Sequence, residues 1–236
     1  MPRLAELLAE SRAQRSGEAA DPGLRSTLPR LRAWQRNRLA ATYRDLVASE
    51  RYHAATAFFL GELYGDLDPG PRDQQLARAA GTFERALPAA ALAVLEQALA
   101  LEMLTRSLDA GLARLLPTGE PITAESYARA YRALGRRPER ERQIEMIVGI
   151  GAALDRWLGR RTVGALLALS RAPARAAGFG ALQDFLDCGY HAFRQLGGAG
   201  EFMATVKARE SELLERLYAG APDPFRGEPR CTASTT

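Results

Sequence analysis

The chain has 236 residues, a net charge of +4 and 47% hydrophobic residues, which suits one large helical domain or two small ones with a sizeable core. Its charged content of 25% is that of a globular protein and excludes a wholly disordered chain. The longest apolar runs, such as residues 146–154, are far shorter than the roughly 20 residues that a membrane-spanning helix needs. The N-terminus is amphipathic and charged, without the apolar stretch of a secretory signal, so the sequence predicts a soluble cytoplasmic protein.

Two features of composition exclude common kinds of site. Cys188 and Cys231 lie far apart and form no Cys-x-x-Cys pair, which argues against a zinc site or a redox motif. Lys207 is the only lysine, so nearly all positive charge is arginine. Because acidic residues alternate with these arginines, as on a solvated helix face, a phosphate-binding arginine surface is the less favoured interpretation.

Apolar residues recur at helical spacing almost throughout, and the sequence predicts an all-α fold: a single multi-helix, bundle-like domain of about eight to ten helices. The β-branched residues are scattered, and Ala, Leu, Arg and Glu, all strong helix formers, dominate. One apolar-to-neutral stripe at helical spacing consists of Leu24, Leu28, Leu31, Gln35, Leu39, Thr42 and Leu46. Helices are expected near residues 2–16, 25–48, 51–64, 72–86, 89–116, 123–134, 138–159, 162–171, 179–196 and 199–218.

Prolines, glycines and one threonine set the expected helix ends. Pro88 should split the stretch 72–116, because its ring removes a hydrogen bond and clashes with the preceding turn. Thr123 is expected to cap the following helix and Gly135 to end it.

The predicted domains are an N-terminal helix with a flexible link over residues 1–23, an all-helical domain over 24–219 and a disordered tail over 220–236. The alternative is two sub-bundles split at residues 117–121.

The stretch of residues 58–76, FFLGELYGDLDPGPRDQQL, joins an aromatic helix end to a Gly/Pro loop and a charged helix start. Its phenylalanines and leucines are expected to pack in the core. Glu62 lies in this apolar stretch and needs a partner, and Arg72 is the nearest basic residue after the loop, so the two are expected to pair. Tyr64 should pack beneath the loop, and Asp73 should stabilise the next helix through its dipole.

The string FFLGELYG, residues 58–65, resembles the signature of the bacterial FFLEELY motif proteins, a family whose function is not known. Gly61 stands where the naming motif has its first glutamate, which shifts weight onto Glu62 and Tyr64 as the motif's matching polar residues. The likeness extends from about residue 51 to residue 218. It implies kinship and helical architecture and names no activity.

The candidate polar cluster combines this motif with the arginine- and tyrosine-rich segment 127–143. Nucleic-acid binding is disfavoured there because Glu139 and Glu141 dilute the positive charge, and Tyr127 and Tyr131 at i, i+4 more simply form an inward-facing stripe. The candidate residues are Glu62, Tyr64, Arg72, Asp73, Tyr127, Arg142 and Gln143.

No cofactor, metal or catalytic residue is predicted. Glu50 and His53 have the Glu-x-x-His spacing of di-iron helices, and Asp187 and His191 could add a second pair, but that class of site uses two such motifs and chance spacing is the better explanation. Phosphate-binding and nucleophile motifs are absent from the sequence.

Because no catalytic constellation is complete, the sequence favours a non-enzymatic scaffold or regulator that acts through protein contacts. The alternative is a small-molecule binder or enzyme with a buried polar site around Glu62, Tyr64, Arg72 and Tyr127. A homodimer is also predicted, since the apolar stripe of Leu4, Leu7 and Leu8 must dock on its own domain or on a neighbouring copy.

Overall fold

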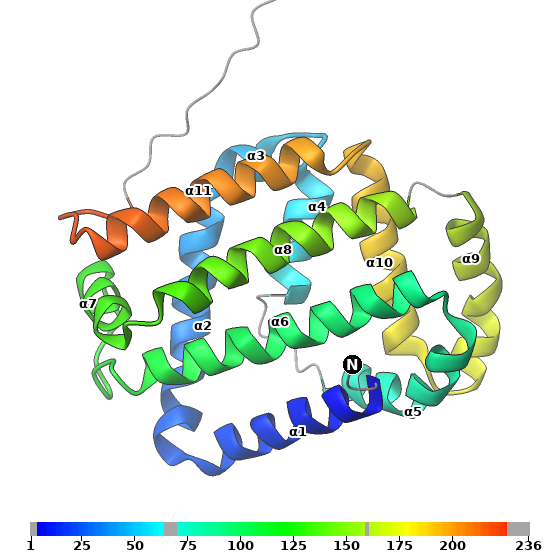
Figure 1. Ribbon diagram of the computed structural model, residues 1–236, viewed down its shortest axis with the longest axis horizontal. Coiled ribbons are helices and arrows are strands. Elements are labelled where there is room, and N and C mark those ends of the chain that lie inside the picture. Colours follow the sequence, from blue (N-terminus) through cyan, green and yellow to red (C-terminus); the bar gives the residue numbers. More distant parts are fainter. Residues whose placement is uncertain (1–3, 64–69, 159–160, 226–236) are drawn as a thin grey trace, which may run out of the picture.

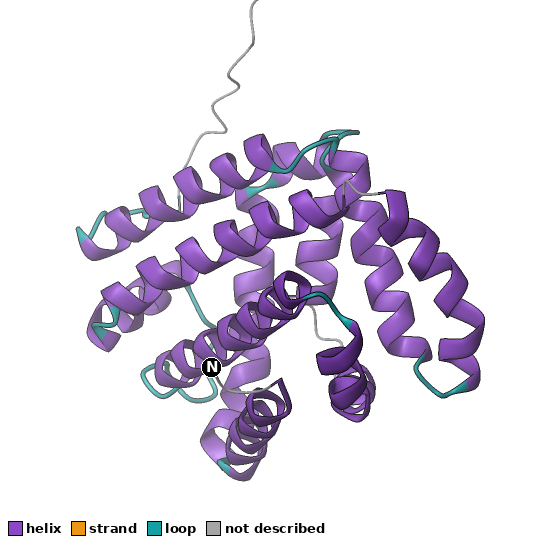
Figure 2. Cartoon of the chain, turned by 45° about the vertical axis from the view of Figure 1, so that its right-hand side comes forward, coloured by secondary structure: helices purple, strands orange, loops and turns teal. Residues whose placement is uncertain are grey.

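The computed structural model describes residues 4–63, 70–158 and 161–225, and in these ranges all regular structure is helical, with no strand (Figure 2). The side chains of residues 62, 63, 70–73, 86, 158, 161 and 162 are not described. The prediction of an all-α fold is confirmed. The described ranges hold eleven α-helices and one π-helical turn, because the expected helix 25–48 breaks at Tyr43 into two.

The elements follow one another without long loops between most of them. They are α1 (Leu4–Ala20), α2 (Pro22–Thr42), α3 (Arg44–Ala48), α4 (His53–Phe58), the π-turn η1 (Phe59–Leu63), α5 (Gly70–Ala86), α6 (Ala89–Ala113), α7 (Ala124–Leu134), α8 (Arg137–Leu158), α9 (Arg161–Ala176), α10 (Gly180–Leu196) and α11 (Gly200–Tyr218).

Four long helices, α11, α8, α6 and α1, lie side by side in one row across Figure 1, and each packs on the next. Helix α8 runs antiparallel to α6, as the pairs Arg136–Ser107 and Gln143–Thr105 show, whereas α1 runs parallel to α6. Behind the row, α2 packs on α6 and on α1, and α4 packs on α10. The site described below lies between this row and the helices behind it.

Helix ends follow the expected local chemistry. Pro88 separates α5 from α6, which confirms the predicted split. Thr123 caps α7 by accepting the backbone N–H of Ser126, whose hydroxyl accepts the N–H of Thr123 in return. Gly135 ends α7 in the left-handed conformation at φ 67°, which glycine adopts without a steric cost.

Helix replaces the flexible link that the sequence predicts at residues 17–23. Helix α1 continues through Gly17 to Ala20, and Asp21 caps α2 by accepting the N–H groups of Gly23 and Leu24 at 3.0 and 3.2 Å. The last turn of α1 is held by Glu18, a buried residue whose carboxylate accepts from Arg106 on α6 at 2.6 Å. This tertiary ion pair favours helix where the local glycines suggest a link. The proposed division at residue 23 stays a prediction.

The C-terminal residues next to α11 are docked rather than free. Pro224 is buried, and the Phe225 ring lies 5.3 Å from Trp34 and 5.8 Å from Tyr127 between centroids. The sequence predicts a disordered tail from residue 220, but the structure describes six residues of that range, 220–225. Residues 226–236 lie outside the described part of the chain.

The apolar residues form three clusters. The first gathers around α2, α6, α7 and the end of α11, and the second around α3, α4, α10 and the start of α11. The third joins Leu4, Leu7 and Leu8 of α1 to Leu99 of α6 and Leu182 of α10. Helix α1 therefore docks on its own chain, and the predicted homodimer stays a prediction.

The burial of a leucine side chain predicts how much stability is lost when that leucine is replaced by alanine. Leu8 is 3% exposed in the third cluster, so Leu8→Ala should lower the free energy of unfolding by about 2–5 kcal/mol through lost burial and a residual cavity. Leu169→Ala on α9, where the side chain is 76% exposed, is the matched control and should cost less than about 0.5 kcal/mol. Urea unfolding measures both, and equal losses would contradict the docking of α1.

Candidate functional site

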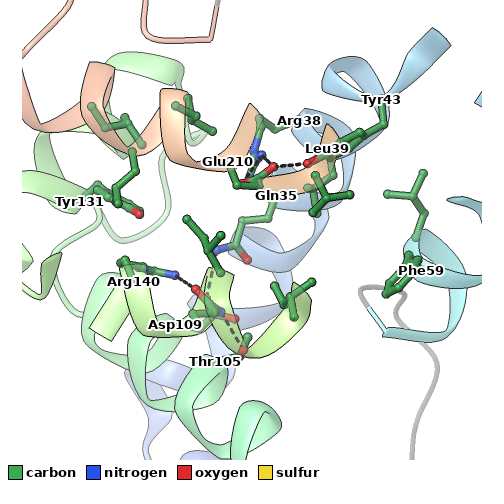
Figure 3. Close-up of a pocket in the computed structure, with 18 of the residues that line it drawn as sticks. Gln35, Arg38, Leu39, Tyr43, Phe59, Thr105, Asp109, Tyr131, Arg140 and Glu210 are labelled. Atoms are coloured by element: carbon green, nitrogen blue, oxygen red, sulfur yellow. Dashed lines mark hydrogen bonds and ion pairs between the residues drawn. The ribbon is translucent and has the colours of Figure 1, made fainter. Parts of the chain in front are cut away.

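A cavity of about 110 Å³ lies behind the row of α6, α8 and α11, where α2, α7 and the π-turn η1 close it (Figure 3). Its lining includes residues of both the first and the second apolar cluster, such as Leu214 and Phe202. The cavity thus occupies the place where the two clusters meet. Its walls are mixed, with a polar side and an apolar side.

The polar side is built from three helices. Gln35 of α2 donates through Nε2 to Oδ1 of Asp109 on α6 at 3.0 Å. On α8, Arg140 donates through Nη1 to Oε1 of Gln143 at 3.2 Å, and Gln143 Nε2 donates to Oγ1 of Thr105 on α6 at 2.7 Å. These contacts connect α2, α6 and α8 through side chains that all line the cavity.

A second polar group joins α2 to α11. Arg38 Nη1 donates to both carboxylate oxygens of Glu210, at 2.9 and 3.2 Å, and the hydroxyl of Tyr43 donates to Oε1 of the same carboxylate at 2.8 Å. The side chains of Arg38 and Glu210 are only 13% and 17% exposed. Desolvation opposes the charged form of Arg38, but the attraction of Glu210 outweighs it and raises the pKa of the guanidinium.

Two guanidinium nitrogens at the cavity have no hydrogen-bond partner among the residues that the structure describes. They are Nε of Arg38 and Nη2 of Arg140, and both atoms are buried. A buried donor without an acceptor costs about 1–3 kcal/mol, and more when the group is charged. The site therefore has two unsatisfied donors beside an internal space.

Burial also acts on the acidic and phenolic groups of the site. It raises the pKa of the Asp109 carboxyl above its ordinary value, although the charge of Arg140, the hydrogen bond from Gln35 and the charges of Arg32 and Arg106 oppose the shift. Burial likewise raises the pKa of Tyr131, over whose ring the Arg140 guanidinium lies at 4.8 Å.

The apolar side begins at the FFLGELYG motif. Its Phe59 and Leu60 line the cavity from η1, and the Phe59 ring stacks on Phe202 of α11 at 5.8 Å. Single π-helical turns are frequent at functional sites. Phe58 is buried against α10, where a Cβ on Gly189 would lie only 3.1 Å from its ring. The aromatic residues of the motif therefore close the cavity and anchor it to α10.

Gly61, the position that departs from the FFLEELY signature, is exposed, and a Cβ there would meet no atom within 4 Å. The described packing gives no steric reason for glycine at this position. The resemblance itself stays a prediction.

Of the residues that the sequence proposes for the polar cluster, the structure brings Tyr127 and Gln143 together at the cavity. Arg142 is exposed and is not part of the lining. The side chains of the other four lie outside the described residues, so the Glu62–Arg72 pair, the packing of Tyr64 and the role of Asp73 stay predictions.

The charged residues and the second glutamine of the cavity are ones that sequence reasoning did not propose as site residues: Gln35, Arg38, Asp109, Arg140 and Glu210. For two of them, the neighbouring residues in the sequence could have indicated a buried polar side chain. Gln35 is a polar residue within a leucine stripe, and Asp109 sits between Leu108 and Ala110, both of which are buried. No sequence pattern distinguishes Arg140, because it is one of several arginines in a charged segment.

The histidines lie elsewhere. His53 and His191 are exposed, and the Nδ1 atoms contact the carbonyl oxygens of Val47 and Asp187 at 2.8 and 2.7 Å. Among the described residues, no three or more His, Cys, Asp or Glu side chains gather closely enough to hold a metal ion.

These features define a class of protein: an all-α domain with a cavity between its helices that has a charged part and an apolar part. The chain belongs to the family described as "Domain of unknown function (DUF8198)", whose model matches residues 14–224. The match includes both the motif and every cavity residue. A comparison with curated proteins found no match, and neither did one with solved structures. No helix in the described ranges combines the length and apolar character needed to cross a membrane.

Removing the charge of Glu210 should be costly. Glu210→Gln leaves Arg38 without a counter-charge in a mostly buried position, so the free energy of unfolding should fall by about 3 kcal/mol, the lower end of the range for buried pairs. Glu201→Gln, which breaks the exposed pair with Arg51, is the control and should cost about 0–1 kcal/mol. Urea unfolding measures both variants, and equal losses of unfolding free energy would contradict a special contribution of the buried pair.

Comparing wild type with Asp109→Asn should reveal the raised pKa of the Asp109 carboxyl through the pH dependence of the free energy of unfolding. A native pKa above that of the unfolded chain means that wild type is favoured at low pH, and that this advantage is lost as pH rises through the native pKa. Stability relative to Asp109→Asn should therefore fall as pH rises from the ordinary pKa of a carboxyl through the raised native pKa of Asp109, by about 1.4 kcal/mol for each unit of elevation. Urea unfolding across this range measures the difference; a constant difference, or a rising one, would contradict the prediction.

Proposed function

We propose that this protein binds a small organic molecule in the cavity between α2, α6, α8 and α11. The observation that carries the proposal is the pair of buried donors, Arg38 Nε and Arg140 Nη2, which have no acceptor in the described part of the chain. A folded chain gains nothing from leaving such donors unsatisfied, and a ligand with acceptor atoms would satisfy them.

The size and composition of the cavity support the same function. Binding sites for small molecules are largely apolar with a few convergent polar groups, and this cavity has that composition. Its volume of about 110 Å³ is somewhat below the roughly 150 Å³ of an apolar cavity known to admit benzene. The ligand should therefore be no larger than a single ring or a short chain.

The scaffold or regulator that the sequence favours is the second candidate function. It is supported by α9, where Leu166 and Leu169 are exposed although they are large and apolar. A cytoplasmic location, a homodimer and kinship with the FFLEELY motif proteins accompany both candidates as predictions.

Toluene and pentanol test whether the cavity admits a guest. At about ten times the dissociation constant, a ligand stabilises the native state by about 1.4 kcal/mol, which raises the Tm of a chain of this length by about 3–6 °C. Either probe should raise the Tm of wild type by such an amount. Val206→Phe, which fills the cavity from α11, should abolish the rise, and Val206→Ala should keep it.

Val94→Phe provides the matched control. Val94 lies on α6 but outside the cavity lining, 11 residues before Thr105 and so roughly 16 Å away along the helix axis. The control should respond to toluene as wild type does. Two outcomes would refute the proposal: no probe shifts the Tm of wild type, or Val206→Phe and wild type shift equally.

A further inference from the structure

Arg140 brings a buried positive charge to the cavity without a carboxylate in contact with it among the described residues. Arg140 is 7% exposed, and its one hydrogen-bond acceptor among the described residues is the neutral amide of Gln143. By contrast, Arg38 in the same cavity has the carboxylate of Glu210 as a direct partner. No carboxylate of the described chain lies within salt-bridge distance of Arg140.

A buried guanidinium without a direct counter-ion is expensive, because desolvation is not offset by a close opposite charge. Asp109 and Arg140 act on each other electrostatically, but no direct contact joins them among the described residues, and Oδ1 of Asp109 accepts from Gln35 instead. Figure 3 shows Arg140 extending from α8 toward Asp109 and Thr105 at the polar wall. The free Nη2 donor therefore offers a position for an incoming anion.

The apolar part of the lining limits what the rest of that anion can be. Phe59 and Leu60 of η1, Ile144 and Ile147 of α8, and Val206 of α11 provide a carbon surface. A ligand that satisfies both walls has one anionic group and an apolar body. The body must be short, since the cavity measures about 110 Å³.

We propose that the ligand is an organic monocarboxylate with a short aliphatic chain or a single ring, held by Arg140 at its carboxylate and by η1 and α11 at its body. This inference rests on the proposed function, since it names the ligand class of the same cavity. A phosphate dianion fits less well, because Arg140 would neutralise only one of its two negative charges and the second would be buried without a partner. The planar guanidinium suits the two oxygens of a carboxylate.

Titration calorimetry with pentanoate and pentanamide tests whether the cavity prefers an anionic ligand. The two probes have nearly the same shape, so their difference in affinity reports the anion. Wild type should bind pentanoate about 10–100-fold more tightly than pentanamide, the range for a hydrogen bond to a charged group. Inorganic phosphate should not compete with pentanoate. Tighter binding of phosphate than of pentanoate would overturn the assignment to a carboxylate.

Three variants locate the interaction. Arg140→Met should reduce pentanoate affinity to that of pentanamide while toluene still binds, and Arg140→Lys, which keeps the charge, should retain part of the preference. Arg142→Met is the matched control, because Arg142 is exposed two residues further along α8, and it should behave as wild type. If Arg140→Met does not fold, the comparison of pentanoate with pentanamide on wild type and Arg140→Lys still decides.

The two proposals fail differently. Equal affinities for pentanoate and pentanamide, with toluene bound, would overturn the carboxylate and leave small-molecule binding intact. Absence of binding by every probe would overturn both. A pentanoate preference that survives Arg140→Met would show that another group holds the anion and would refute the role of Arg140.

Discussion

Buried charge at the junction of two apolar clusters is the constraint on which the arrangement of this protein depends. Helices α2, α6, α8 and α11 each direct polar side chains to this junction, where these side chains are mostly buried. Each such group must then find a partner on another helix or cost several kcal/mol. The contacts Gln35–Asp109, Gln143–Thr105 and Arg38–Glu210 meet this requirement and fix the helices relative to one another.

A second group of buried charges acts in the same way between α1 and α6. Glu18 accepts from Arg106 at 2.6 Å and from Arg32 at 3.4 Å, while Glu102 accepts from both Arg106 and Arg15. Arg32 and Arg106 also act on Asp109 at the cavity. The docking of α1 and the electrostatics of the cavity are thus physically connected through α6, although no cavity residue comes from α1.

The polar junction differs from an ordinary core in that it is not fully satisfied. Arg38 and Arg140 each keep one donor without an acceptor among the described residues, next to an internal space. A purely structural network of the same size would be expected to close on itself, because partly satisfied networks are less stable than apolar packing. The α1–α6 network also leaves one buried atom without a partner among the described residues, the acceptor Oε1 of Glu18. The junction differs in that its two unpartnered atoms are donors on residues that line a cavity, which is what the proposed ligand site requires.

The sequence by itself determined the helical class, the break at Pro88, the caps of α7 and the inward stripe of Tyr127 and Tyr131, because these depend on periodicity and on local backbone chemistry. The candidate site was determined only in part, through Tyr127 and Gln143. Tertiary structure decided the rest: it placed Gln35, Asp109 and Arg140 from three helices at one cavity and held residues 17–20 in helix through Glu18. The physical reason is that the partner of a buried charge lies far away in the sequence, 74 residues for Gln35 and Asp109 and 172 for Arg38 and Glu210, and no local pattern encodes which distant helix will supply it.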